Sequence, residues 1–194
     1  MIEIRSWTAK RSGLFARLMK HIYQIITGVF LALPLIAIGG GVQLIGEYAK
    51  FSEEVIGGDP HVTGYEIDLY KQGNFLFGEL IVGTGSIDIK SGLLENITLD
   101  ETTKSLKFTA KLSTTLTNDP ETGNWRPTRD LYIFSGKIDK HLIIGTLEHR
   151  DGYKEDVPGN IERIKLPRFK NKNGREYVPK SMDKWLKYKA RQDW

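Results

Sequence analysis

The pattern of hydrophobic and polar residues divides the chain into an apolar N-terminal stretch and a longer alternating region. From Ile22 to Gly46 no charged residue occurs over 25 positions. As an α-helix this stretch would measure about 37 Å, which exceeds the ~30 Å hydrocarbon core of a bilayer. We therefore predict a single transmembrane helix over residues 22–46. A cleaved signal peptide is the alternative, but the apolar run is longer than such peptides need and lacks a clean cleavage site.

One side of the predicted helix is rich in small residues. Small side chains let two membrane helices approach closely, so self-association through this helix is one expectation. The alternative is that glycine is simply common in membrane helices. The residues that would make the helix–helix contact are Gly28, Ala32, Gly39, Gly40 and Gly41.

The charges on either side of the apolar stretch predict its orientation. Residues 1–21 carry five Lys or Arg and one acid, whereas residues 47–61, which we expect to be a juxtamembrane linker, carry one Lys and four acids. Positive flanks stay on the cytoplasmic side. The prediction is a single-pass membrane protein with a basic cytoplasmic N-terminal segment and an extracytoplasmic domain.

From about residue 62 the pattern changes to a period of two, which is typical of strands with one buried face. It is clearest where Leu106, Phe108, Ala110 and Leu112 alternate with polar residues. About eight such runs fit within residues 62–166, with short connections between them. We therefore predict an all-β soluble domain, an antiparallel meander that closes into a barrel or a sandwich. The turns are expected at Gly83–Gly85, Ser91–Gly92, Asp100–Lys104 and Asp139–Lys140, among others.

Two architectural resemblances follow from this order of elements. The strand count resembles that of calycin-type barrels, which hold small ligands, although no early Gly-x-Trp motif is present. The order of helix and then barrel is similar to that of cyclic-oligonucleotide-activated antiviral effectors, whose members carry two membrane helices. That resemblance implies a ligand-gated effector, in which the barrel senses a cyclic-nucleotide-like molecule and drives assembly of the membrane helices. Such a barrel would have to lie in the cytoplasm, against the charge-based orientation.

The longest connection inside the β region spans residues 116–129 and contains Trp125, Arg126 and Arg129. An exposed tryptophan between two arginines suits stacking on a planar or anionic ligand, so these residues form a candidate ligand or partner loop. The alternative is that Trp125 packs over one end of the barrel.

The C-terminal residues 167–194 read as a basic tail that ends in a short amphipathic helix. Residues 161–194 carry eleven Lys or Arg and four acids, and Ser181 can cap the helix. The residues Lys184, Trp185, Lys187 and Arg191 would suit an anionic membrane surface. Packing back on the domain and simple solvation are the alternatives. Nucleic-acid binding conflicts with an extracytoplasmic location.

No motif in the sequence carries a recognisable chemistry. Cysteine is absent, the four histidines lack metal-ligand spacing, and neither a nucleophile elbow nor a phosphate loop occurs. No catalytic, cofactor-binding or metal-ligating residue is therefore predicted. The sequence favours a membrane-anchored, non-catalytic β domain at the cell envelope. Its expected partners are the lipid bilayer, a second copy of the chain, and an envelope protein or small ligand.

Overall fold

A computed structural model describes residues 40–86, 89–154, 156–169, 177–187, 189 and 194. The predicted cytoplasmic segment 1–21 and most of the predicted membrane helix, including Gly28, Ala32 and Gly39, lie outside these residues. Within the described part of the chain, no helix has the length and apolar character needed to cross a bilayer.

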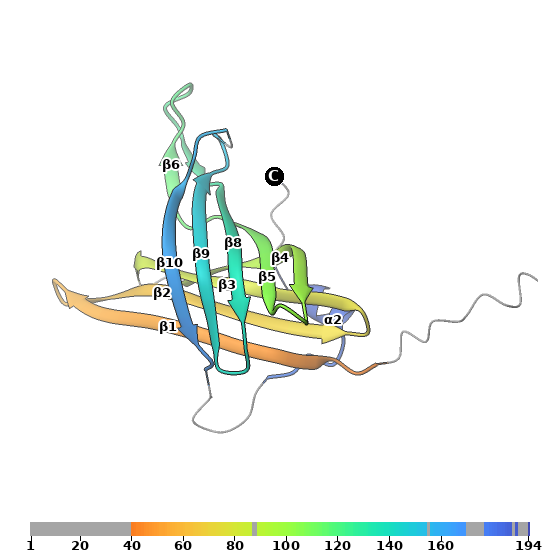
Figure 1. Cartoon of the computed structure of the whole chain (residues 1–194). Coiled ribbons are helices and arrows are strands. Elements are labelled where there is room, and N and C mark those ends of the chain that lie inside the picture. The colour runs from red at the N-terminus through yellow and green to blue at the C-terminus, as the bar shows by residue number, and fades with distance from the viewer. Residues whose placement is uncertain (1–39, 87–88, 155, 170–176, 188, 190–193) are drawn as a thin grey trace, which may run out of the picture. The chain divides into compact units, whose positions relative to one another are not determined.

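The described residues form an eight-stranded antiparallel sheet that is nearly closed into a barrel (Figure 1). Each ladder joins strands that follow one another in the chain, except that β5 pairs with β8 because β6 and β7 form a separate small hairpin. The all-β class and the antiparallel meander predicted from the sequence are confirmed. The strands are β1 (Gln43–Ile56), β2 (Asp59–Gln72), β3 (Phe75–Ser86), β4 (Ile89–Asp100), β5 (Ser105–Leu112), β8 (Asp130–Ile138), β9 (Leu142–Asp151) and β10 (Asn160–Pro167).

The junction between the first and last strands holds one isolated bridge. Tyr48 of β1 forms an isolated antiparallel bridge with Arg168, which directly follows β10. Beside it, the Phe169 N–H donates to the Glu47 carbonyl over 2.7 Å. This contact closes one end of the junction between β1 and β10, and no ladder continues it along the two strands.

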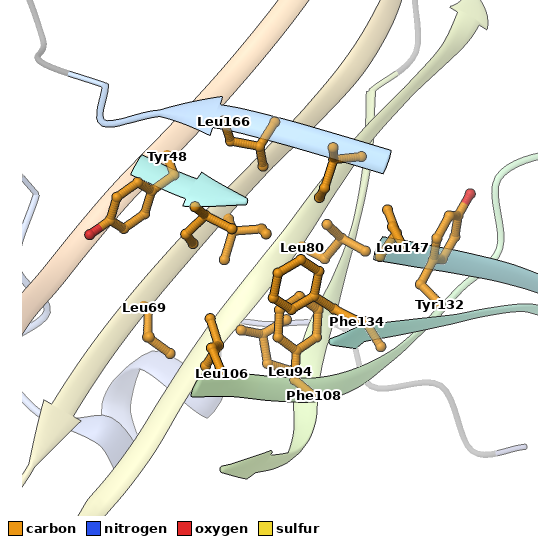
Figure 2. Close-up of a cluster of buried hydrophobic side chains, with 14 of the residues drawn as sticks. Tyr48, Leu69, Leu80, Leu94, Leu106, Phe108, Tyr132, Phe134, Leu147 and Leu166 are labelled. Carbon is orange, nitrogen blue, oxygen red and sulfur yellow. The ribbon is translucent and has the colours of Figure 1, made fainter. Parts of the chain in front are cut away.

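The interior of the barrel is an apolar core to which all eight strands contribute. Leu106, Phe108, Ala110 and Leu112 are all buried, as their alternation predicts. The rings of Phe108 and Phe134 stack at the centre with centroids 5.0 Å apart, and Figure 2 shows leucines from several strands around them. Burying each such side chain stabilises the fold by roughly 1.5–3 kcal/mol.

The sheet begins earlier in the chain than the sequence predicted. Residues 47–61 are not a linker but belong to β1 and the start of β2, and Gln43–Gly46, placed at the end of the membrane helix, open β1. The two strands are joined at Gly57–Gly58, both with positive φ, which is the conformation that tight hairpin turns require. Most charged residues of this segment, Lys50, Glu53, Glu54 and Asp59, are exposed, whereas Glu47 is buried.

Two predicted turns are strand interiors instead. Gly83–Gly85 lies in β3 and Ser91–Gly92 in β4. A Cβ at Gly83 would lie 2.7 Å from the Val62 carbonyl oxygen, so glycine here permits close approach of two strands rather than a turn. The turn at Asp100–Lys104 is confirmed, with the Asp100 carboxylate accepting the N–H groups of Thr102 and Thr103.

The predicted C-terminal helix is present as α2 (Met182–Lys187). It packs on the outer face of the sheet, where Trp185 meets Phe77 edge-on at 5.3 Å between ring centroids and Tyr70 at 6.0 Å. A second, smaller buried cluster therefore lies outside the barrel.

Candidate partner-binding site

The predicted ligand loop forms the hairpin β6 (Leu116–Asn118) and β7 (Trp125–Pro127). Trp125 is 71% exposed, so it does not pack over the barrel end. Arg126 forms an ion pair with Asp119 at 3.1 Å, and its guanidinium lies 3.6 Å from the centroid of the Tyr153 ring. Arg129 lies over the same ring at 4.7 Å. Both arginines thus already have partners within the chain, while Trp125 and Arg129 are exposed and Arg126 is partly exposed.

At the base of this hairpin, Asp130 collects hydrogen bonds from His149, Thr128 and Thr114. Burial alone would raise the pKa of Asp130, but these hydrogen bonds outweigh it and lower the pKa to about 2. The two hydroxyls donate to the carboxylate and not to the imidazole, so the arrangement lacks the nucleophile–base contact of a hydrolase. The adjoining hollow of about 110 Å³ is smaller than the ~300–1,000 Å³ of typical ligand pockets. These hydrogen bonds join the residues on either side of the β6–β7 hairpin to Asp130 of β8 and His149 of β9.

The predicted membrane-contact residues of the tail differ in their exposure to solvent. Lys184 and Lys187 are exposed, whereas Trp185 is 5% exposed and lies against the sheet. Arg191 lies outside the described residues. Trp185 thus follows the alternative in which the helix packs back on the domain.

Of the predicted helix-contact residues, Gly40 and Gly41 lie in a non-helical segment directly before β1. The Gln72 side-chain amide donates to the Gly40 carbonyl over 3.2 Å. This contact ties the segment to the end of β2.

The outer face also carries a row of carboxylates across β1, β2 and β3. Glu47 pairs with Asp68, and Asp68 pairs with Glu79, in adjacent ladders, and all three are less than a tenth exposed. Lys189 reaches Glu79 at 2.5 Å. Among the described residues, no group of three or more acidic or histidine side chains is arranged to hold a metal ion.

A cleft that could receive a partner segment lies at the junction of β1 and β10. Past the Tyr48–Arg168 bridge the two strands diverge and leave a cleft of about 410 Å³, which we call the seam cleft. Its walls include Lys50 and Ser52 of β1, Tyr65 of β2, and Glu162, Arg163 and Lys165 of β10. Across its floor the Tyr65 hydroxyl donates to Glu162 over 2.9 Å. Burial and the Glu162 carboxylate raise the pKa of Tyr65, so its phenol keeps its proton.

Both walls of the seam cleft present backbone groups that no ladder uses. In an antiparallel strand every second residue directs its N–H and C=O to the same side. Since Glu47 accepts from Phe169 across the junction, Phe51 and Glu53 also direct their backbone groups toward the seam. On β10 the same parity applies to Arg163 and Lys165. β1 is paired with β2, and β10 is paired with β9. Among the described residues, no ladder joins β1 to β10 across the seam cleft.

Large apolar side chains are exposed beside these edges. Val55 and Ile56 near the tip of β1 are 70% and 56% exposed, and Ile161 at the start of β10 is 64% exposed. Exposed apolar residues on unpaired strand edges are features that soluble proteins usually avoid, and they mark interaction sites.

Sequence reasoning missed the seam cleft because residues 47–61 were assigned to a linker. The signal that could have revealed β1 was Gly57–Gly58 between two alternating runs, a common hairpin turn pattern. No signal in a single sequence indicates that β1 and β10 meet at one bridge only.

Comparison with known proteins found no matching family model, no matching curated protein and no matching solved structure.

Proposed function

We propose that this chain is a membrane-anchored, non-catalytic binding protein whose β domain captures an extended segment of a partner protein. The segment would enter the seam cleft as an additional strand between β1 and β10. The observation that carries this proposal is the pair of unpaired strand edges that flank the cleft. In this mode of recognition, main-chain hydrogen bonds supply affinity and alternate side chains supply specificity.

The energetics favour a strand over a compact ligand. Each main-chain hydrogen bond contributes a net ~0.5–1.5 kcal/mol, and Phe51, Glu53, Arg163 and Lys165 offer N–H and C=O groups on both sides of one inserted strand. Val55 and Ile161 add apolar surface at the outer end. The barrel interior is filled by side chains, so an extended segment would bind at the strand edges and not inside the barrel.

Proline substitution at the edges tests the proposal directly. Glu53→Pro and Arg163→Pro each remove one seam-facing N–H but no bond of the existing ladders, since that N–H points away from β2 or β9. The matched controls Glu53→Ala and Arg163→Ala change the same side chains and keep the N–H. A displayed library of random peptides of about eight residues, a strand length that fits a sheet edge, would be selected for binding to the full chain.

We expect the selected segments to bind the wild type and both alanine variants alike. Each proline variant should bind about tenfold or more weakly, because a buried acceptor on the segment is left without a donor. Thermal unfolding of each variant reports whether the barrel is intact. Equal binding by an intact proline variant, or failure to select any segment, would contradict strand addition.

The anchor part of the proposal rests on the uncharged residues Ile22–Gly39. These 18 residues would span about 27 Å as a helix, close to the ~30 Å of a bilayer core, and the five Lys or Arg before them favour a cytoplasmic N-terminus. Two C-terminal fusions test it, one reporter being active only outside the cell and the other fluorescent only inside. We expect membrane fractionation and the outside signal. An inside signal would refute the orientation and favour the ligand-gated effector.

A further inference from the structure

A second hollow lies at the end of the barrel where the Tyr48–Arg168 bridge closes the sheet. It measures about 460 Å³, within the ~300–1,000 Å³ of small-molecule sites. We call it the end pocket. It lies between the β4–β5 turn, the β8–β9 turn and the start of β1, and the Lys104 carbonyl accepts the Ile138 N–H over 2.9 Å to hold the two turns together.

The floor of the end pocket is apolar. It is made by Ile45, Leu99 and Ile138 with the ring of Tyr48. The Tyr48 hydroxyl does not face a ligand as a free donor, because it donates to the Asp139 carbonyl over 2.7 Å. The floor therefore offers contact for hydrocarbon and few hydrogen bonds, which suits an alkyl chain better than a nucleobase.

The rim of the end pocket is charged, and the acids on it have partners. Glu101 forms an ion pair with Lys71 at 2.7 Å. The Asp139 carboxylate accepts the N–H groups of His141 and Leu142 at 2.6 and 2.8 Å. Glu101 thus has a cationic partner, and the Asp139 carboxylate accepts hydrogen bonds from the backbone.

The cations on the rim are Lys104, Lys140 and Arg168. Among the described residues, neither lysine ammonium makes a hydrogen bond or an ion pair, and Arg168 donates to the Ile45 carbonyl over 3.2 Å. An apolar floor below these cations, of which Lys104 also lowers the pKa of Asp100 and Glu101, is complementary to a molecule with a hydrocarbon body and one negative head.

We propose that the end pocket binds a single-chain anionic amphiphile of the fatty-acid type. The alkyl chain lies on Ile45, Leu99 and Ile138, and the carboxylate meets Lys104 and Lys140. This site is separate from the seam cleft and does not depend on partner binding there.

Photolabelling of the full chain in discs of zwitterionic phosphatidylcholine tests the proposal. The probes are dodecanoic acid and dodecanol, each with a photoreactive diazirine, and peptide mass spectrometry locates the label. We expect the acid to label the peptides that contain Ile45, Leu99 and Ile138, and the alcohol to label them several-fold less.

Variants distinguish the contribution of the carboxylate head group from that of the alkyl tail. Lys104→Gln combined with Lys140→Gln should lower labelling by the acid roughly three- to tenfold, the size expected of two exposed charge contacts, and leave labelling by the alcohol unchanged. Lys107→Gln combined with Lys137→Gln removes the same charge from exposed positions of β5 and β8 outside the pocket and should change nothing. Leu99→Trp fills the hollow and should reduce labelling by both probes.

Three outcomes would overturn the proposal. They are equal labelling by acid and alcohol, labelling that is unchanged in the Lys104/Lys140 variant, and complete protection by phosphatidylglycerol in the disc. The last would show that the rim meets a bilayer surface and not a free amphiphile.

Discussion

The two faces of β2 are both buried, but in different ways. Ile67 and Leu69 point into the barrel and are covered by apolar side chains of the other strands. Asp68 and Tyr70 point outward and are as well buried, yet the cover on that side includes Trp185 of the distant C-terminal segment. The inner face is enclosed by the other strands of the sheet. The outer face is covered in part by a segment from the C-terminal end of the chain. Burial alone therefore does not reveal which part of the chain provides the cover.

The chemistry of the two faces differs accordingly. The inner face is apolar throughout, whereas the outer face holds Glu47, Asp68 and Glu79 side by side. Burial and the neighbouring carboxylates of Glu66, Glu79 and Glu47 raise the pKa of Asp68 to about 8, and its Oδ1 atom has no hydrogen-bond partner. Like charges opposite one another weaken a sheet. The repulsion among the carboxyl groups of the outer face is reduced where one of them keeps its proton or forms an ion pair with Lys189.

The largest expected effect is the difference in the free energy of unfolding between a side-chain truncation on the inner face and one on the outer face. Phe134→Ala leaves a cavity beside Phe108 in the closed interior and should lower the free energy of unfolding by about 3–5 kcal/mol. Trp185→Ala should cost about 2 kcal/mol, because the loss is limited to the docking of a short segment on a sheet that remains folded. Urea unfolding followed by circular dichroism measures both.

Exposed positions supply the controls for this comparison. Phe169→Ala and Trp125→Ala make the same changes where the side chains are 47% and 71% exposed, and each should alter the free energy of unfolding by no more than about 0.5 kcal/mol. A Trp185 loss as large as that of Phe134 would show that the two faces belong to one cooperative core.

A smaller and pH-dependent effect is expected at the outer face. With a pKa of about 8 against an ordinary 3.8, the folded state binds the Asp68 proton more tightly than the unfolded state does. Wild-type stability therefore falls as pH rises from about 4 to about 8. Asp68→Asn keeps the neutral shape and should be the more stable protein above pH 8, by roughly 1–3 kcal/mol.

Thermal unfolding across pH 4–9 checks this prediction. Asp59→Asn makes the same change at the exposed first residue of β2 and should follow the wild type throughout. A constant difference between Asp68→Asn and the wild type would show that the row of carboxylates does not titrate in this range.

The sequence revealed strands best where one face is buried and the other is solvated. Leu106, Phe108 and Ala110 alternate with exposed or partly exposed residues, so their period is visible without any tertiary information. The turn at Asp100–Lys104 was equally visible, because its aspartate bonds to neighbouring N–H groups. Local interactions of this kind leave a local signal.

The features that escaped prediction depend on distant parts of the chain. Gly83 and Gly92 were assigned to turns, although they lie in strands and permit close approach of Val62 and Lys111. Trp185 was assigned to a membrane surface, with packing on the domain only as an alternative, because its partners Tyr70 and Phe77 are more than a hundred residues away in sequence. The seam cleft likewise depends on where β1 meets β10, which no local pattern encodes.

The single bridge between Tyr48 and Arg168 has a consequence for the order in which the domain assembles during synthesis. Apart from the ladder of β5 with β8, which the β6–β7 hairpin separates, the other main ladders join strands that follow one another in the chain. Hairpins from β1 onward can therefore pair as they leave the ribosome. Closure alone needs two residues that are 120 positions apart. Until the residues after β10 emerge, the edge of β1 stays open along its whole length. The nascent domain is therefore receptive to an added strand well before it is complete.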